Sequence, residues 1–179
     1  NKMVIEITID EGQQYLVGDL RIQGNEMFST QELLFTETSD GPIERLGMNK
    51  GDLFTPAGLE ENRSALEDLY ESQGHLTPRN QGNTLIGEFK TANAEKGTID
   101  IDYKIEEGET SYIEKIQIRG NTKTKDKVLR RELAVAPGEP FNMVLAKLSQ
   151  QRLEGLNYFE SVETDVEPTD IPDRKDLVL

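Results

Sequence analysis

An internal repeat constrains this chain more than any other feature of its sequence. The run LRIQGN at residues 20–25 recurs 96 residues later as IQIRGN at residues 116–121, and the preceding Glu11-Gly12 recurs as Glu107-Gly108. A repeat with a spacing of 96 residues corresponds to one structural module. The chain is therefore expected to hold two copies of the same small fold.

The strands of each copy are indicated by strict alternation of apolar with polar residues. The run IEITID at residues 5–10 recurs at the same spacing as IDYKIE at residues 101–106, and a third such stretch, KDLVL, occupies residues 175–179. A period of two predicts strands with one face on a core and the other in water. The chain therefore divides into residues 1–11, the last strand of a preceding unit, residues 12–107, the first unit, and residues 108–179, a second unit whose last strand is truncated.

Two helices are expected in each unit after its Gly-Asn turn. In the first unit, Ser29 and Glu32 have the spacing of a capping box, and Thr55-Pro56 starts a longer helix that ends before Gly74. In the second unit, periodicity predicts a helix over residues 124–135 and another between Asn142 and Asn157. We expect the helix at residues 124–135 to be better defined than its counterpart after Ser29 in the first unit.

The remaining strand of each unit lies between its second helix and its last strand. It is predicted at residues 83–91 in the first unit, with 76–79 as a possible addition, and at residues 160–167 in the second. Residues 38–47 are predicted to be a surface loop, because they contain glycine and proline. Each unit thus runs strand, helix, helix, strand, strand, which places the chain in the α+β class.

Composition excludes several classes of function. With 34 acidic and 20 basic residues, the net charge of -14 repels phosphate backbones, so nucleic acid is not an expected partner. The chain has no cysteine, which excludes disulfides, zinc-thiolate sites and thiol nucleophiles, and no cofactor is expected. Its single histidine, His75, follows Gly74 and is interpreted as a turn residue. No apolar run is long enough to span a membrane.

The pattern resembles POTRA domains, the polypeptide-transport-associated modules. The residues that carry the resemblance are the Gly-Asn turns, Pro137 to Phe141, and the helix-closing run Leu156 to Glu160. The second unit is similar to the barrel-proximal POTRA of BamA-type outer-membrane assembly proteins, and the first to the penultimate one. The resemblance implies a three-stranded mixed sheet with two helices on one face.

An unpaired sheet edge is the feature through which such a module is expected to bind. Exposed backbone donors and acceptors can accept an added strand, a mode called β-augmentation. The resemblance implies that unfolded outer-membrane proteins, or partner subunits, bind in this way. We expect the middle strand of each unit to supply the edge, with these residues along it: Leu85, Ile86, Glu88, Phe89, Ser161, Val162, Thr164 and Val166.

A second expected site is the charged cluster Arg130, Arg131 and Glu132. Such a cluster is typical of a solvated helix face, but the resemblance implies that these positions dock an accessory lipoprotein, with Glu132 as the ion-pairing residue. The resemblance also implies a periplasmic location at the inner face of the outer membrane, and a β-barrel following in the full-length protein.

Two other classes of function were weighed. An enzyme would need converging catalytic groups, and Asp100 and Asp102 instead lie on the polar face of an alternating strand. No catalysis is therefore expected. A POTRA array from another transporter, for two-partner secretion, translocation assembly or organellar import, remains open at this stage, as does an unrelated adhesive repeat.

Overall fold

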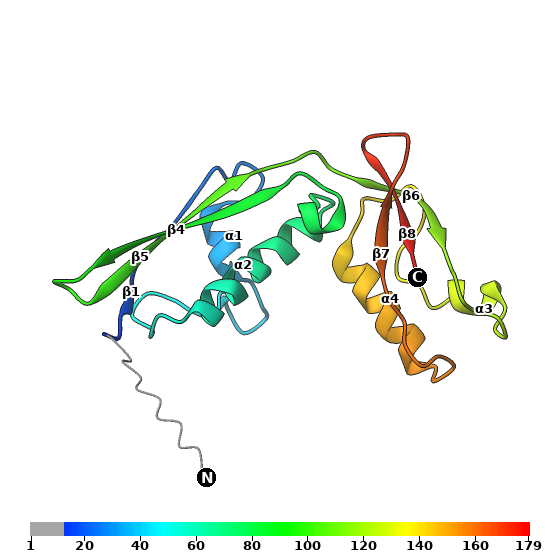
Figure 1. Ribbon diagram of the computed structural model, residues 1–179, viewed down its shortest axis with the longest axis horizontal. Helices are drawn as coiled ribbons and strands as arrows, with labels where there is room; N and C mark the ends of the chain where they lie inside the picture. The colour runs from blue at the N-terminus through cyan, green and yellow to red at the C-terminus, as the bar shows by residue number, and fades with distance from the viewer. Residues whose placement is uncertain (1–12) are drawn as a thin grey trace, which may run out of the picture.

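The computed structural model describes residues 13–179, which form two α+β units placed end to end (Figure 1). The predicted strand at residues 5–10, and with it the preceding-unit assignment of residues 1–11, lies outside the described residues. Each unit has its own sheet of three strands and its own hydrophobic cluster. The predicted fold class is confirmed.

The first unit contains one long helix, one short helix and a small additional hairpin. Its elements, in chain order, are β1 Leu16–Gln23, α1 Thr30–Leu34, β2 Phe35–Thr36, β3 Ile43–Glu44, α2 Pro56–Glu71, a 3₁₀ turn Pro78–Asn80, β4 Leu85–Asn93 and β5 Thr98–Glu106. The second unit repeats this order without the hairpin. Its elements are β6 Tyr112–Gln117, α3 Asp126–Arg130, α4 Met143–Gly155, β7 Asp165–Pro168 and β8 Arg174–Val178.

Both sheets share one topology. The strand order is β1-β5-β4 in the first unit and β6-β8-β7 in the second, so the last strand of each unit is central. The first strand pairs with it in parallel and the middle strand in antiparallel. Each parallel pair also has a register shift at the same place, between Val17 and Leu20 and between Ile113 and Ile116.

Both helices of a unit cover the same face of its sheet. In the first unit, Ile101, Tyr103 and Ile105 of β5 are buried against α1 and α2, together with Leu33 and Leu66. Burying a leucine side chain stabilises the fold by about 2 kcal/mol, so these contacts hold helices and sheet together. No helix within residues 13–179 is long and apolar enough to cross a membrane.

The capping motifs explain where the helices begin. Ser29 Oγ accepts from the Glu32 N–H at 3.3 Å, and Glu32 accepts from the Ser29 N–H at 2.8 Å, which confirms the capping box. These bonds from Ser29 hold the pKa of Glu32 below its usual range. Thr55 and Asn142 cap the two long helices through their side chains. Asn157 ends α4 at a φ of 56°, as its position predicted.

The short helix of the second unit is less extensive than predicted. It spans only Asp126–Arg130 instead of residues 124–135, and its N-cap Lys125 makes no side-chain capping bond. After Arg131 the backbone turns away, because the Ala134 N–H donates to Ser149 Oγ of α4 at 2.8 Å. The expectation that this helix is the better defined one was therefore wrong: α1 has the same length and a complete capping box.

Several strand boundaries also differ from prediction. Residues 76–79 form a loop that runs into a 3₁₀ turn, and the predicted surface loop at 38–47 contains the β3 strand of the small hairpin. Strand β4 runs to Asn93 rather than residue 91, since nine consecutive residue pairs connect it to β5. Strand β7 starts at Asp165 rather than residue 160, because β8 offers it only four pairing partners.

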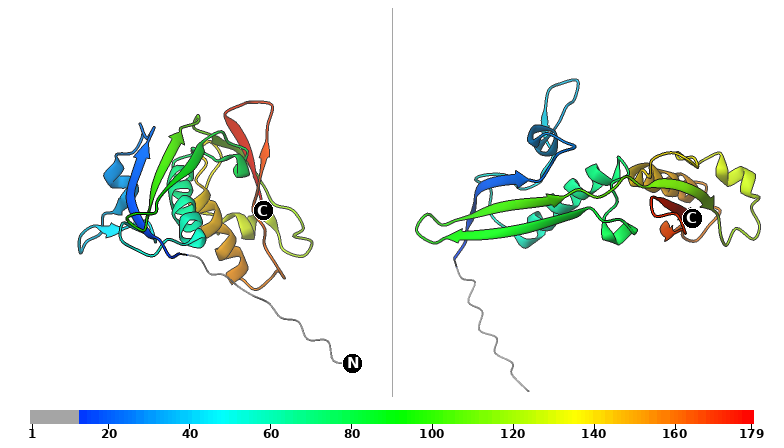
Figure 2. Two further views of the ribbon diagram at one scale, coloured as in Figure 1. Left: turned by 60° about the vertical axis from the view of Figure 1, so that its left-hand side comes forward. Right: turned by 90° about the horizontal axis from the view of Figure 1, so that it is seen from above.

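The units meet through their long helices. Helices α2 and α4 lie next to each other between the two sheets, and the tip of the β4–β5 hairpin points away from the second unit (Figure 1). The view from above shows the same hairpin extending to one end of the molecule (Figure 2). One edge of the first sheet is therefore presented along the side of an elongated molecule.

Candidate functional site

The two outer edges of each sheet are not equivalent. Along the first strand, the edge is partly closed by the segment that precedes the long helix. The Val17 N–H donates to Asp52 O at 2.8 Å, the Gly51 N–H donates to Val17 O at 2.9 Å, and the Phe54 N–H donates to Tyr15 O at 2.9 Å. This part of β1 is thus unavailable to another strand.

The second unit closes the same edge in the same way. The Ile113 N–H donates to Glu139 O at 2.9 Å and the Gly138 N–H to Ile113 O at 2.7 Å. The Phe141 N–H donates to Ser111 O at 2.8 Å. Because both units repeat these bonds, closure of the first-strand edge is a property of the module.

The opposite edge of the first unit is open. Strand β4 has nine residues, and within residues 13–179 its backbone makes no hydrogen bond outside the sheet. Antiparallel pairing uses alternate residues of an edge strand, and the other residues direct their N–H and C=O groups outward. The open edge of β4 therefore offers a row of unpaired backbone groups about 30 Å long, at about 3.4 Å per residue.

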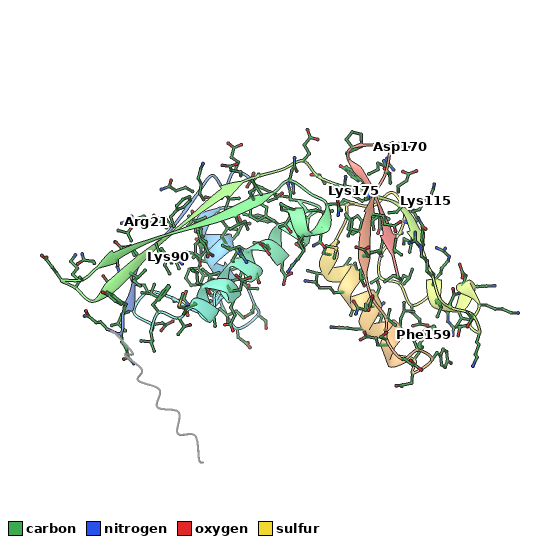
Figure 3. The ribbon with its side chains drawn as sticks, in the orientation of Figure 1. Arg21, Lys90, Lys115, Phe159, Asp170 and Lys175 are labelled. Carbon is green, nitrogen blue, oxygen red and sulfur yellow. The ribbon has the colours of Figure 1, made fainter. Side chains whose placement is uncertain are left out.

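The side chains of β4 alternate between two environments. Leu85 and Phe89 lie on the outer face and are 47% and 58% exposed, and Phe89 covers Gly87, with its ring 3.5 Å from the glycine's Cβ position. Ile86 packs against the hydrophobic cluster beneath the sheet. Figure 3 shows Lys90 on β4 and Arg21 on β1, at the two sides of the same sheet. The predicted residues Leu85, Ile86, Glu88 and Phe89 all lie on this open strand.

A polar cluster lies beneath the open edge, on the side of α2. Burial raises the pKa of Tyr103 to about 12, while Asn62 acts to lower this pKa and Glu88 to raise it. Burial also raises the pKa of Glu67, although Arg63 and Arg79 oppose it from 3.8 and 3.9 Å. This side of the strand is therefore charged, in contrast to the apolar outer face.

The open edge of the second unit is short and protected. Strand β7 has four residues and ends in Pro168, which has no N–H to donate. The Val166 N–H donates to the carboxylate of Asp165 at 2.8 Å, and the side chain of Val166 is buried. Natural sheets use proline to blunt an edge, so the Pro168 end of β7 is a poor template for an added strand.

Three of the residues expected on this edge lie before β7. Ser161, Val162 and Thr164 belong to a segment without strand pairing, because β8 has no residues opposite them. Gln150 of α4 holds this segment, donating to Val162 O at 2.7 Å and accepting from Thr164 Oγ1 at 2.9 Å. A cavity of about 460 Å³ adjoins it, lined by residues that include Ile118, Phe159 and Val162. Figure 3 places Phe159 at the end of the unit opposite Asp170.

The expected charged cluster is spread over the end of α3. Arg130 is the last residue of the helix and donates to Ile116 O at 3.1 Å, so it ties α3 to its own sheet. Arg131 and Glu132 follow the helix and pair with each other at 3.1 Å. The side chain of Arg131 is 70% exposed. Arg131 is thus fully available at the surface, the side chain of Glu132 is only 29% exposed, and Arg130 also has an internal structural role.

The acidic side chains weighed as candidates for chemistry, Asp100 and Asp102, make their contacts within the first sheet. Within residues 13–179, no group of three acidic or histidine side chains could hold a metal ion. Asp100 accepts from the Asp19 N–H at 2.8 Å, and Asp102 pairs with Arg21 at 3.4 Å. These two acids therefore serve the sheet itself, as their place on a polar strand face suggested.

Two buried polar side chains were missed by sequence reasoning. Asn62 of α2 holds the loop before it, accepting from the Met48 N–H at 3.0 Å and donating to Met48 O at 2.7 Å. In the second unit, Ser149 accepts from the Ala134 N–H at 2.8 Å. Both are fully buried and lie seven residues after a capping residue, Thr55 and Asn142. A polar residue on the apolar stripe of each long helix was the available signal.

The fold and its edges define a tandem array of strand-helix-helix-strand-strand modules with one open edge strand. The family model described as "Surface antigen variable number repeat", POTRA, matches residues 15–108 and 111–179. The chain therefore belongs to the POTRA family, which confirms the resemblance read from its sequence.

The relatives with similar sequences are outer-membrane assembly factors. A candidate outer membrane protein assembly factor of Treponema pallidum is 32% identical over 179 residues, which cover 100% of this chain and 20% of that protein. The outer membrane protein assembly factor BamA of Neisseria meningitidis is 30% identical over 98% of this chain and 20% of its own length. The chain thus spans about a fifth of the length of these relatives.

Solved structures share the fold. BamA from Haemophilus ducreyi lacking POTRA domains 1–3 matches with a TM-score of 0.70 and 24% identity, covering 92% of this chain and 28% of that one. Haemophilus influenzae BamA POTRA3-5 matches with a TM-score of 0.63 and 14% identity, covering 97% of this chain and 98% of that one. Both matches show that this chain shares the fold of these tandem domains.

Proposed function

We propose that this chain is a binding segment of an outer-membrane β-barrel assembly factor, in which the open edge of β4 receives unfolded outer-membrane proteins by strand addition. The observation that carries the proposal is the contrast between this nine-residue edge, the first-strand edges, whose starts are closed by backbone bonds, and β7, which ends in a proline. Main-chain hydrogen bonds recognise any extended segment, which suits a receptor for many clients.

The side chains of β4 support this role. An added strand would place alternate residues beside Leu85 and Phe89 on the outer face, where apolar side chains bury surface at the edge. Strands of membrane barrels alternate apolar and polar residues, and they match such an edge in either direction. The net charge of -14 keeps the chain from adhering to anionic lipid headgroups.

The titration of ¹⁵N-labelled protein with an extended outer-membrane-protein peptide tests the proposal. Amide chemical shifts should change along residues 85–93 and in the neighbouring β5, and they should not change at β7. A peptide N-methylated at alternate residues is the control, because it has lost the donors on one side and should not bind. Shifts confined to α2 and α4 would refute strand addition at this edge.

Phe89 offers a variant that leaves the fold intact. Its ring is largely exposed, so Phe89→Lys removes apolar contact and adds a charge to the edge without opening the core. Peptide affinity should fall about tenfold, while the unfolding transition should stay within about 0.5 kcal/mol. Equal affinity for both proteins would mean that the outer face plays no part in binding.

We further propose that Arg131 and Glu132 dock an accessory lipoprotein of the assembly machinery, with Arg130 as a supporting residue. Glu132→Lys should reduce capture of that partner by affinity purification, and Lys127→Glu on the same helix is the matched charge reversal. Equal capture by the wild type and Glu132→Lys would remove this assignment. The location that goes with this function is the periplasm, with a β-barrel supplied by the rest of a longer chain.

A further inference from the structure

The loop between α2 and β4, residues 72–84, crosses from the first unit to the second. Gly74 has a φ of +90°, and its carbonyl accepts from the Ser111 N–H at 2.8 Å. A Cβ atom at Gly74 would lie 2.8 Å from Thr110 Cγ2 and 2.9 Å from Ser111 O. Glycine therefore permits both the backbone conformation and the close approach of the two units at this point.

Leu76, two residues later, is completely buried, yet its neighbours belong to the other unit. It is part of the hydrophobic cluster that contains Ile113, Phe141 and Met143. Within the described residues, it is the one member of that cluster that precedes residue 108. The second unit thus completes its core with a side chain from the first.

The loop is held rigidly in the shape that presents Leu76. The fully buried Glu71 accepts from Thr77 Oγ1 at 2.6 Å and from Asn80 Nδ2 at 2.7 Å. The Thr84 N–H donates to Leu76 O at 3.0 Å. A Cβ at Gly82 would lie 1.9 Å from this same oxygen, so the loop is closely packed on itself. Leu76 is therefore held in position by contacts within the first unit.

The peptide between the units is also fixed on both sides. The two ring nitrogens of His75 lie 2.8 Å from Gly108 O and 3.2 Å from Thr110 Oγ1. The Gly108 N–H donates to Thr84 Oγ1 at 3.2 Å. His75 is thus a turn residue that also binds the connection between the units.

We propose that residues 72–84 are a structural part of both units, and that Leu76 makes the stability of the second unit depend on the first. The two modules then form one body with a fixed relative orientation, although the repeat divides them at residue 107. The same loop leads directly into β4, so the open edge and the second unit share one rigid support.

Hydrogen exchange of the full chain tests this coupling, with two matched leucine truncations. Leu76→Ala should accelerate exchange of the second-unit core amides Ile113 and Leu177 about 100-fold, and those of Ile101 and Tyr103 much less. Leu66→Ala removes an equally buried leucine from the first-unit cluster and should accelerate Ile101 and Tyr103 first. Acceleration confined to the first unit in Leu76→Ala would overturn the proposal.

A milder variant covers the case in which Leu76→Ala does not fold. Leu76→Val deletes one methylene and should accelerate the same second-unit amides about fivefold. Residual dipolar couplings of this variant provide a second readout, since a loosened junction should reduce the agreement of the two units with a single alignment tensor. Unchanged exchange in the second unit, together with one shared tensor, would show that Leu76 does not couple the units.

Discussion

The two units of this chain have the same topology and the same closed first-strand edge, but opposite kinds of middle strand. Strand β4 is long, unpaired on its outer side and free of proline, whereas β7 is short and ends in Pro168. Both units therefore share the bonds that close the start of the first-strand edge, while the proline at the end of β7 distinguishes the two middle strands.

The length of the central strand accounts for part of this difference. Strand β5 offers β4 nine pairing positions, up to Glu106, while within residues 13–179 β8 offers β7 four, up to Val178, one residue before this sequence ends. The length of the central strand also affects the turn that follows each first strand. Gly24 and Gly120 have the same φ of +81°, and Gly24 lies under the backbone of the central strand, at Ile105. The pairing of Gln117 with Val178 places the position opposite Gly120 after Leu179, so within residues 13–179 Gly120 has no such neighbour.

Alanine at these two glycines should give the largest contrast between the units. A Cβ at Gly24 would lie 2.1 Å from Ile105 O, and at Gly120 it would meet no atom within 4 Å. Gly24→Ala should destabilise the chain by about 4 kcal/mol or more, and Gly120→Ala by about 1 kcal/mol, the cost of the left-handed conformation alone. Urea unfolding measures both, and equal losses would mean that the turns are packed alike.

The buried polar residues of the long helices should give the next largest effect. Asn62→Ala leaves both the N–H and the C=O of Met48 unpaired in the interior, at a cost of about 3 kcal/mol. Ser149→Ala leaves one N–H unpaired, that of Ala134, and should lower the stability of the fold by about 1 kcal/mol. Urea unfolding of both variants measures the two losses of stability. A larger loss for Ser149→Ala than for Asn62→Ala would contradict the prediction.

The edge strand of the second unit, β7, can be made more like β4 by substitution. Replacing Pro168 by threonine and Asp165 by alanine restores an N–H to β7 and frees that of Val166. The double variant should show new, weak peptide-induced amide shifts at residues 165–168, with stability changed by about 0.5 kcal/mol at most. If the amides of β7 do not shift while those of β4 in the same molecule do, the short length of β7 alone prevents an added strand from binding there.

The smallest expected effect is at Glu107, which holds the turn of the first unit. Burial acts to raise the pKa of Glu107, but hydrogen bonds from Tyr70 Oη and from the N–H groups of Met27 and Glu26 outweigh it and hold the pKa below its usual range. A carboxyl group with a lowered pKa stabilises the fold above its unfolded pKa, and this stabilisation is lost as the pH falls through the folded pKa.

Glu107→Gln should accordingly lower stability at neutral pH and reduce the loss on acidification below about pH 4. Chemical denaturation at a series of pH values measures it. Parallel pH profiles for the wild type and Glu107→Gln would show that other carboxylates account for the acid sensitivity.

The sequence predicted the parts of this fold that depend on local pattern. Alternation at residues 101–106 and the Ser29–Glu32 spacing identified a strand and a helix start, because their causes lie within a few residues. Residues 160–164 were also predicted as part of a strand but form none, since pairing depends on a partner far along the chain. Residues 76–79 were predicted as a possible strand from local pattern alone. No local pattern indicates which of the two hydrophobic cores an apolar residue such as Leu76 joins.

The closed first-strand edges also limit how copies of this molecule can associate. Edge-to-edge stacking continues indefinitely only when each copy presents two open sides, one to bind and one to be bound. Within residues 13–179, the backbone bonds at Val17 and Ile113 block the start of the first-strand edge in each sheet. Another copy could therefore not pair with this part of the first strand, which leaves β4 as the longest edge available to it within residues 13–179.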